Sequence, residues 1–510
     1  MRRFVAVAIV LAALMSAGPR AKGFDDPPAL DDPPRTMAAP IEPTDRPFPI
    51  NLAAALRLSD ARPLVVAAAQ AGVWVAEARL ARARVLWVPT LVIGADYIRH
   101  DGGGPDFNKG IMTAPSANFF YGGAAADLYV NMTDAIFEPL AARRDLEART
   151  WDVQSAKNDS LRMTADAYFA VHEARGLYSG HLYAVERGRA VVDRIRDQSS
   201  DLVPRIEVDR ARNLVADLEQ RATSAREDWR VRSANLTQVL RLDPRAVVEP
   251  MEPDHLQITL LDPARPIDEL MKIALANRPD LASHRAQVEA AEVRIRREKM
   301  RPRLPIIMLN GFQSAGMWIQ AGLFGLGPNS SLNQWEGRVD VSVQAIWQLE
   351  GFGLGNLARI KAQRGEESRA IVALRDTQDS VAADVTRAVA RLQSAAARIS
   401  QADRALRSAS IAFEGTYEGL TQTRRFGDVL MPINRPQEAV YSLKLLDLAF
   451  EEYYRTVADY NRAQFELYHS LGYPAAEVAL ANPPGEPIPV DTGRPPYLPP
   501  VGNGPPPASR

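Results

Sequence analysis

Three glycines stand where a strand-like segment meets a helix-like one, in the stretch WQLEGFGLGNLARIKAQR at residues 347–364. A glycine-rich loop between a strand and a helix is a pattern that binds phosphate through backbone N–H groups. Gly351, Gly353 and Gly355 therefore have two interpretations. They form either a phosphate cradle or a sharp turn that passes the chain from strand to helix.

The strand before these glycines favours the turn. Its residues alternate between apolar and polar, with Ile346 as the exception. A buried strand of a nucleotide-binding fold should instead be apolar on both faces. The matching junction earlier in the chain, at residues 134–144, has no glycine run. The apolar positions of the second strand are Val339, Val341, Val343, Ala345, Trp347 and Leu349.

The remaining residue patterns give little support to catalysis. His172-Glu173 lacks a second histidine at the HExxH spacing, since the next histidine is His181. The absence of cysteine excludes disulfides, thiolate metal sites and cysteine nucleophiles. A net charge of −1 does not indicate a basic nucleic-acid face. We predict no catalytic residue, no metal, no cofactor and no nucleic-acid partner.

The N-terminal segment has the pattern of a secretory signal. Arg2 and Arg3 precede an apolar run that is too short to span a membrane, followed by small residues. We expect a signal peptide over 1–21 and proline-rich disordered segments over 22–48 and 476–510. No other apolar run is long enough for a transmembrane helix, so any membrane insertion would use strands.

The body of the chain, about 49–475, contains an internal repeat with two copies. Arg62-Pro63 recurs as Arg278-Pro279, and in both copies a second proline follows 26 residues after the first, at Pro89 and Pro305. Each copy continues with a strand, a loop rich in Gly, Pro or Asn, a second strand and a long helix. We assign the first repeat to 49–262 and the second to 263–475. The expected strands are about 86–99, 118–133, 304–314 and 335–349, and the loops are 101–117 and 314–334.

The helices are expected to be unusually long. The segments at about 139–198 and 356–424 would reach roughly 90 and 100 Å at ~1.5 Å per residue. Apolar residues step by three and four along three helices, which is the pattern of a coiled-coil seam. These seams run from Val208 to Trp229, from Ile371 to Phe413 and from Leu443 to Leu471.

Each long helix is expected to end in a turn that carries an aspartate and a proline. The first turn contains Asp201 and Pro204, and the second contains Asp428 and Pro432. Proline suits the first turn of the next helix, because its missing N–H group has no partner to lose there. The unit is therefore helix, strand, strand, long helix, turn, helix.

Four two-faced strands of roughly 10 residues match the length of membrane-spanning strands. Four strands cannot hide their edges in lipid, and the smallest membrane barrels need about 8. Any inserted barrel must therefore be shared between chains. The aromatic residues at the strands belong either to a lipid-interface girdle or to the core. They are Trp87, Phe119, Phe120, Tyr121, Trp335 and Trp347.

This duplicated plan resembles the TolC-like outer membrane efflux proteins, the outer-membrane factors of efflux and type I secretion systems. The stretch YEGLTQTRRFGDVL (417–430) and the L…A…RP helix start are also similar to that family. The resemblance implies a mainly α protein with a transmembrane β part. It implies a homotrimer whose four strands per chain form one 12-stranded barrel on a long helical coiled-coil tunnel. The second turn departs from the family pattern by its prolines, Pro432 and Pro436.

The implied function is a passive exit duct in the outer membrane, with its helical part in the periplasm. The implied partners are outer-membrane lipid, a periplasmic adaptor (membrane fusion) protein and an inner-membrane pump of the RND, ABC or MFS type. Polar side chains gate the tip in that family. The matching residues here are Asp201, Arg424, Arg425 and Asp428, which are otherwise ordinary turn residues.

A secreted periplasmic coiled-coil scaffold without channel activity is the alternative. Such a scaffold would be soluble without detergent, and its strands would bury their apolar faces within the chain itself.

Overall fold

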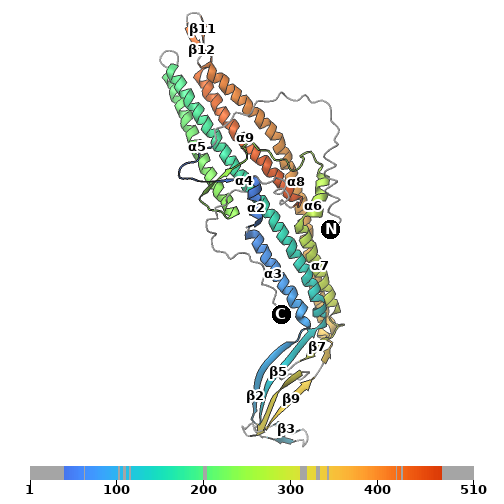
Figure 1. The fold of residues 1–510 in the computed structure, drawn as a ribbon. Helices are drawn as coiled ribbons and strands as arrows, with labels where there is room; N and C mark the ends of the chain where they lie inside the picture. The colour runs from blue at the N-terminus through green and yellow to red at the C-terminus, as the bar shows by residue number, and fades with distance from the viewer. Residues whose placement is uncertain are drawn as a thin grey trace, which may run out of the picture.

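The chain forms a long rod with a β-sheet at one end and a small hairpin at the other (Figure 1). Long helices connect the two ends. In both repeats a long helix leaves the sheet, so the two repeats lie side by side along the rod. The computed structural model describes residues 39–61, 64–101, 104–106, 111–113, 117–198, 204–309, 319–328, 334–341, 344–420, 422–426 and 429–473.

The first repeat begins with two helices, crosses the sheet twice and then forms a long helical hairpin. Its elements are β1 (Arg46–Ile50), α2 (Leu52–Ala61), α3 (Leu64–Arg84), η1 (Val85–Trp87), β2 (Thr90–His100), β3 (Gly104–Asp106), β4 (Ile111–Thr113), β5 (Ala117–Asn131), α4 (Met132–Gln198), α5 (Arg205–Leu240) and β6 (Ala246–Pro250).

The second repeat follows the same plan and adds a hairpin between its two longest helices. Its elements are α6 (Ile267–Asn277), α7 (Pro279–Met300), β7 (Ile306–Leu309), β8 (Ile319–Pro328), β9 (Gln334–Val341), β10 (Gln344–Ile346), η2 (Glu350–Gly353), α8 (Leu354–Gly419), β11 (Thr423–Phe426), β12 (Val429–Pro432) and α9 (Pro436–Ser470).

The sheet has four strand positions, in the order β2, β5, β7 with β8, and β9 with β10. All pairings within it are antiparallel. The register aligns apolar residue types on one face and places most of the polar types on the other. The apolar face contains positions Leu91, Ile93, Tyr97, Phe120, Ala124, Ala126, Ile319, Ala321, Leu323, Trp335, Val339 and Val341. The register agrees with the predicted apolar face at Val339, Val341 and Ala345, whereas Val343 lies outside the described residues and Trp347 and Leu349 follow the end of β10.

The segment 314–334 was predicted to be a loop, and that prediction is wrong for β8. Its glycines suggested turns, but they serve strand packing instead. Gly325 pairs with both Phe120 and Trp335 on the apolar face. A residue without a side chain between them lets the two rings meet, at 5.4 Å between centroids. Glycine in a strand often marks this kind of close approach.

The register also sorts the candidate girdle aromatics. Phe120 and Trp335 lie on the apolar face, whereas Phe119 and Tyr121 alternate with Phe120 and fall on the opposite face. Trp87, Trp335 and Trp347 are exposed, so they are not core residues of the monomer.

The long helices pack along the predicted seams. α4 has 67 residues and α8 has 66, which correspond to roughly 100 Å each. The positions at the centres of the three seams are buried. They include Leu218 and Trp229 of α5, Val385 and Leu392 of α8, and Leu446 and Val457 of α9. α4 contacts α3 and α5 of the first repeat and α7 and α9 of the second, so it packs against helices of both repeats.

A small parallel sheet lies midway along the rod and joins the two ends of the first repeat. β1 pairs with β6, with Phe48 opposite Val248. The indole N–H of Trp229 donates to the Val248 carbonyl at 2.9 Å and fixes this sheet on α5. Ordered structure therefore begins before residue 49, within the segment predicted to be disordered.

The predicted second turn, which lies at the far end of the rod, is a β-hairpin and not a simple connection between two helices. β11 pairs with β12, and Pro432 sits opposite Thr423 at the end of the ladder. Pro436, not Pro432, opens the next helix. Pro204 is the residue just before α5. Sequence reasoning chose the wrong one of two nearby prolines, because either could start a helix.

The glycine run makes the sharp turn that its sequence predicts. Gly351 and Gly353 adopt φ of 54° and 94°, a left-handed conformation that glycine tolerates. The Glu350 N–H group donates to the Asn356 side chain at 3.1 Å and closes the turn onto α8.

The segment Leu52–Trp87 is long and apolar enough to cross a membrane by length and composition alone, contrary to the expectation from sequence. Only 17% of its most apolar window is buried within the chain. It comprises α2, α3 and η1, and α2 and α3 both pack on α4. Packing along the rod therefore buries only a small part of this apolar window.

Candidate functional site

The predicted gate residues lie at the hairpin end of the rod. Arg424 and Arg425 are on β11, where their backbones pair with Met431 and Leu430. Asp201 and Asp428 lie outside the described residues. The grouping of these four side chains therefore stays a prediction.

A cluster of cation–aromatic contacts near the same end joins the two repeats. Arg187 of α4 forms an ion pair with Glu414 of α8. Its guanidinium also lies 5.6 Å from the Phe413 ring. About two turns further along α4 toward the tip, the Arg194 guanidinium lies 4.4 Å from the ring of Tyr417. We call Arg187, Arg194, Phe413, Glu414 and Tyr417 the tip clamp.

A second contact near the tip joins α5 to α9. The Gln437 side chain donates to the Glu207 carboxylate at 3.0 Å, and Arg210 donates to the same carboxylate at 2.7 Å. Glu207 is buried although it lies close to the tip. Near the tip, α4 therefore contacts α8, and α5 contacts α9, so both helices of the first repeat's hairpin are joined to the second repeat.

A buried charge cluster lies further from the tip. His181 of α4 contacts Asp447 of α9 at 2.6 Å, and the Arg221 guanidinium of α5 lies 3.6 Å from the same carboxylate. Asp447 is almost completely buried. Burying a carboxylate is costly unless it is paired, so these side chains hold the three helices in one arrangement.

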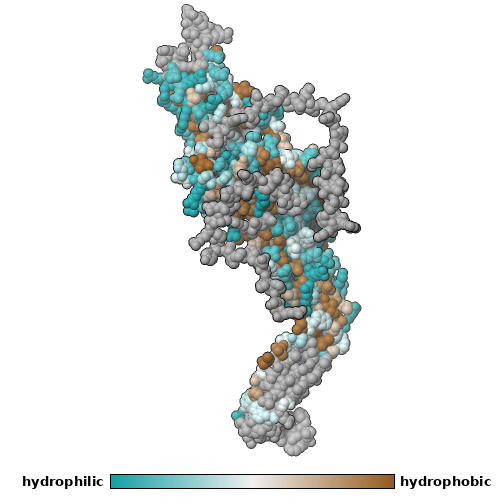
Figure 2. Space-filling view, in the orientation of Figure 1, coloured by the Kyte–Doolittle hydropathy of each residue, from teal (hydrophilic) through white to brown (hydrophobic). Residues whose placement is uncertain are grey.

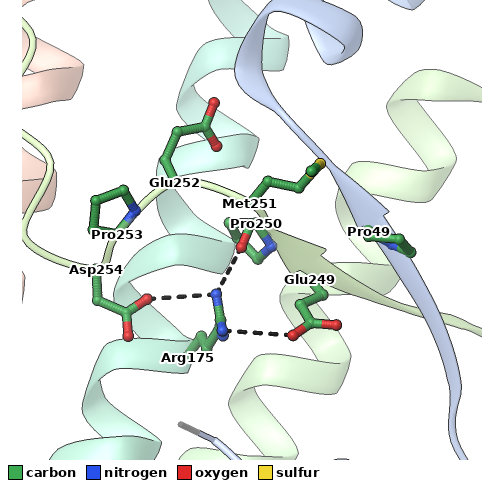
Figure 3. Close-up of a pocket in the computed structure, with 8 residues that line it drawn as sticks. All are labelled: Pro49, Arg175, Glu249, Pro250, Met251, Glu252, Pro253 and Asp254. Atoms are coloured by element: carbon green, nitrogen blue, oxygen red, sulfur yellow. Dashed lines mark hydrogen bonds and ion pairs between the residues drawn. The ribbon is translucent and has the colours of Figure 1, made fainter. Parts of the chain in front are cut away.

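A hollow of about 500 Å³ lies beside the small parallel sheet, with Arg175 at its centre (Figure 3). Arg175 donates to the Pro250 carbonyl at 2.7 Å. Its guanidinium also lies 3.6 Å from Glu249 and 3.7 Å from Asp254. These contacts fasten the segment after β6 onto α4. The lining residues are Pro49, Arg175, Glu249, Pro250, Met251, Glu252, Pro253 and Asp254.

Burial shifts the pKa values of two titratable side chains near this hollow. Burial, reinforced by the charge of Glu252, raises the pKa of Tyr168, whose hydroxyl donates to that carboxylate. Burial lowers the pKa of His172, with Asp254 and Glu252 opposing the shift. Both side chains are buried, so they lie within the packed interior and not in an open cleft.

No group of three or more His, Asp or Glu able to hold a metal occurs among the residues that the structure describes. The polar and cation–aromatic contacts described above mostly join one helix to another. Sequence reasoning missed the tip clamp because its members are far apart in the chain. Tyr417 lay within the stretch that carried the family resemblance, but its partner Arg194 had no signal of its own.

Part of the chain resembles a known family. Residues 270–420 match the family model for outer membrane efflux proteins. A sequence search against curated proteins gave no match. The predicted resemblance to the TolC-like outer membrane efflux proteins is confirmed by this match, which is to a transport family.

Solved structures of such channels share the fold. The outer membrane protein VceC of Vibrio cholerae aligns with a TM-score of 0.64 at 14% identity, covering 82% of this chain and 96% of that one. The Campylobacter jejuni CmeC outer membrane channel gives 0.62 at 14%, covering 83% and 85%. The open state of the Neisseria gonorrhoeae MtrE outer membrane channel gives 0.63 at 14%, covering 83% and 89%. These likenesses show that the chain shares the fold of those proteins.

Proposed function

We propose that this protein is the outer-membrane exit duct of an efflux or type I secretion system. The observation that carries the proposal is a sheet with one apolar face, mounted on helices of about 100 Å. The sheet would sit in lipid, and the helices would extend through the periplasm. Solute would pass passively, because the energy would come from a partner pump.

Three copies would complete the duct. The sheet's two open edges are β2 on one side and β9 with β10 on the other. Unpaired edges are not tolerated in lipid, so β2 of one copy would pair with β9 of the next. Four strand positions per copy give a 12-stranded barrel from three copies. The polar sheet face would then line the lumen.

The tip would form the gate. Opening a tunnel of packed helices requires one helical hairpin to move against the other. In each copy the tip clamp and the Gln437–Glu207 contact tie α4 and α5 to α8 and α9. We therefore propose that these contacts keep the tip closed. The residues suggested by the sequence, Asp201, Arg424, Arg425 and Asp428, would act with them.

A duct of this kind needs partners at its periplasmic end. A periplasmic adaptor would dock on the helical rod and connect it to an inner-membrane pump of the RND, ABC or MFS type. The hydrophilic helix surface toward the hairpin end suits a docking surface in water (Figure 2).

Light scattering on the mature protein, with and without detergent, tests the proposal. We expect a trimer that needs detergent and that forms conducting pores in planar lipid bilayers. A soluble monomer or dimer without conductance would reject the duct and leave the periplasmic scaffold.

A further inference from the structure

The hollow beside the small parallel sheet contains more carboxylates than its contacts neutralise. Among the described residues that line it, Glu249, Glu252 and Asp254 are acidic and Arg175 alone is basic (Figure 3). Glu252 already has partners, because each of its oxygens accepts a hydrogen bond, one from a tyrosine hydroxyl and one from the Leu52 N–H group. Two further carboxylates share one guanidinium, so the lining carries a net negative charge.

Two lining side chains also have buried polar atoms that make no hydrogen bond. Arg175 donates to the Pro250 carbonyl, but it approaches Glu249 and Asp254 only at 3.6 and 3.7 Å, which is beyond hydrogen-bond distance. The Nε atom of Arg175 and the Oδ1 atom of Asp254 have no hydrogen-bond partner among the described residues. Buried polar atoms are normally hydrogen-bonded, so this wall of the hollow can accept a further polar group.

The chemistry of the hollow selects a cation with several N–H donors. An anion would be repelled by the net charge of the lining, whereas a guanidinium offers five donors and is more weakly hydrated than an ammonium group. The rest of the lining is apolar and would contact the residues beside such a cation. It consists of Pro49, Pro250, Met251 and Pro253.

The chain itself contains a segment with this chemistry. The stretch GRPPYLPP at residues 493–500 places Arg494 directly before Pro495 and Pro496. Residues 492–510 include no acidic side chain, so nothing in this stretch competes with the carboxylates of the hollow. Proline-rich sequences favour the extended polyproline II helix and therefore lose little conformational entropy on binding.

The end of α9 is close enough for this segment to reach the hollow. Asn461 of α9 hydrogen-bonds the backbone of 256–258 at 2.7 and 2.8 Å, so the segment that lines the hollow lies near this level of α9. α9 ends at Ser470, roughly 14 Å further along its axis at ~1.5 Å per residue. About 20 residues separate Tyr473 from Arg494, and they span roughly 60 Å at ~3.1 Å per residue.

We propose that the hollow binds the proline-rich segment 493–500 of the same chain, with the Arg494 guanidinium donating to Asp254 and Glu249. Pro495 and Pro496 pack against the apolar part of the lining. The segment that follows the second repeat is thereby fastened to the small parallel sheet of the first repeat. This inference goes beyond the proposed function, because it requires neither a membrane nor a partner pump.

Disulfide trapping in the full chain tests the proposal, because the chain has no cysteine of its own. Met251→Cys, at an exposed lining position, is combined with Gly493→Cys, next to Arg494. The matched control combines Gly493→Cys with Val231→Cys. Val231 is exposed on α5, two residues from the Trp229 that bonds the same small sheet. Oxidation in detergent is followed by non-reducing gels and by mass spectrometry of the linked peptides.

We expect the 251–493 disulfide to form within one chain and at least about tenfold faster than the 231–493 disulfide, because binding raises the local concentration at one site only. Equal rates at the two positions would show random encounters and would overturn the inference. Absence of both disulfides, or a 251–493 disulfide between two chains, would also overturn it. None of these outcomes bears on the exit duct, which is tested by conductance.

Two charge reversals in the same segment identify the cation. Arg494→Glu should slow formation of the 251–493 disulfide at least about tenfold, as expected for the loss of a charge-assisted hydrogen bond. Arg510→Glu makes the same change of charge outside the proline stretch and should leave the rate unchanged. Equal slowing in both variants would show general attraction between charges and would remove Arg494 from the hollow.

Discussion

The Nδ1 atom of His181 lies 2.6 Å from the Oδ1 atom of Asp447, and this contact joins α4 of the first repeat to α9 of the second. The carboxylate is 1% exposed and is also approached by Arg221 of α5. A single buried aspartate therefore links three helices. Such a charge keeps its position only while its partners remain.

Asp447→Ala should destabilise the protein by about 3–5 kcal/mol, because it leaves the buried His181 without its partner and removes the carboxylate that the half-buried Arg221 approaches. The measurement is denaturant unfolding followed by circular dichroism. Asp209→Asn removes an exposed i,i+3 pair with Arg212 and should cost about 1 kcal/mol or less. Equal losses in the two variants would show that the buried cluster contributes no more than a surface ion pair.

Gly176→Ala should destabilise the contact between α4 and α9. A Cβ atom at this position would lie 2.6 Å from the Tyr454 ring, so the ring or the helix must shift. We expect a loss of about 1–3 kcal/mol in denaturant unfolding. Gly365→Ala in α8 meets nothing within 4 Å and should instead stabilise by about 0.5–1 kcal/mol. Stabilisation by both substitutions would contradict the close approach at Gly176.

The seams and the alternation along the strands were predictable because each depends on local periodicity. Residues such as Leu392 and Val457 are buried where a three-and-four spacing places them. β8 was missed because glycine signals both turns and close strand contacts, and only the partner strand decides between them. The tip clamp was missed because Arg194 and Tyr417 come together only after α4 and α8 pack. Pairings between distant segments carry no local sequence signal.

Ile93→Arg should block membrane insertion. Ile93 is 77% exposed on the apolar face, so a charge there would meet lipid at a cost of about 2–4 kcal/mol near the midplane. Gly94→Arg is the matched control, since position 94 points to the opposite face into open space. Recovery in outer-membrane fractions measures both. We expect Gly94→Arg to insert and to lower conductance. Equal recovery of the two variants would argue against a lipid-facing surface at Ile93.

His172 should make stability depend on pH below neutrality. Burial lowers its pKa in the folded protein, whereas the unfolded chain titrates at about 6.5. As the pH falls through this value, the unfolded state binds a proton that the folded state does not bind. The free energy of unfolding therefore decreases. The stability difference between wild type and His172→Leu, measured from pH 8 to about pH 5, should therefore shrink or reverse in favour of the variant as the pH falls. A difference that is constant with pH would show that His172 titrates alike in both states.

Loss of the contact between Arg194 and Tyr417 should open the tip. A cation–π contact of this kind contributes about 0.5–2 kcal/mol, which corresponds to about a two- to thirtyfold change in the ratio of open to closed states. Arg194→Ala should therefore raise single-channel conductance or open probability in planar bilayers. Arg189→Ala is the control, because Arg189 pairs with Glu219 of α5 within the same helical hairpin. Arg189→Ala should leave the closed state unchanged, since it breaks no tie between the repeats. An equal rise in conductance in both variants, or no rise in either, would show that Arg194 is not part of the gate.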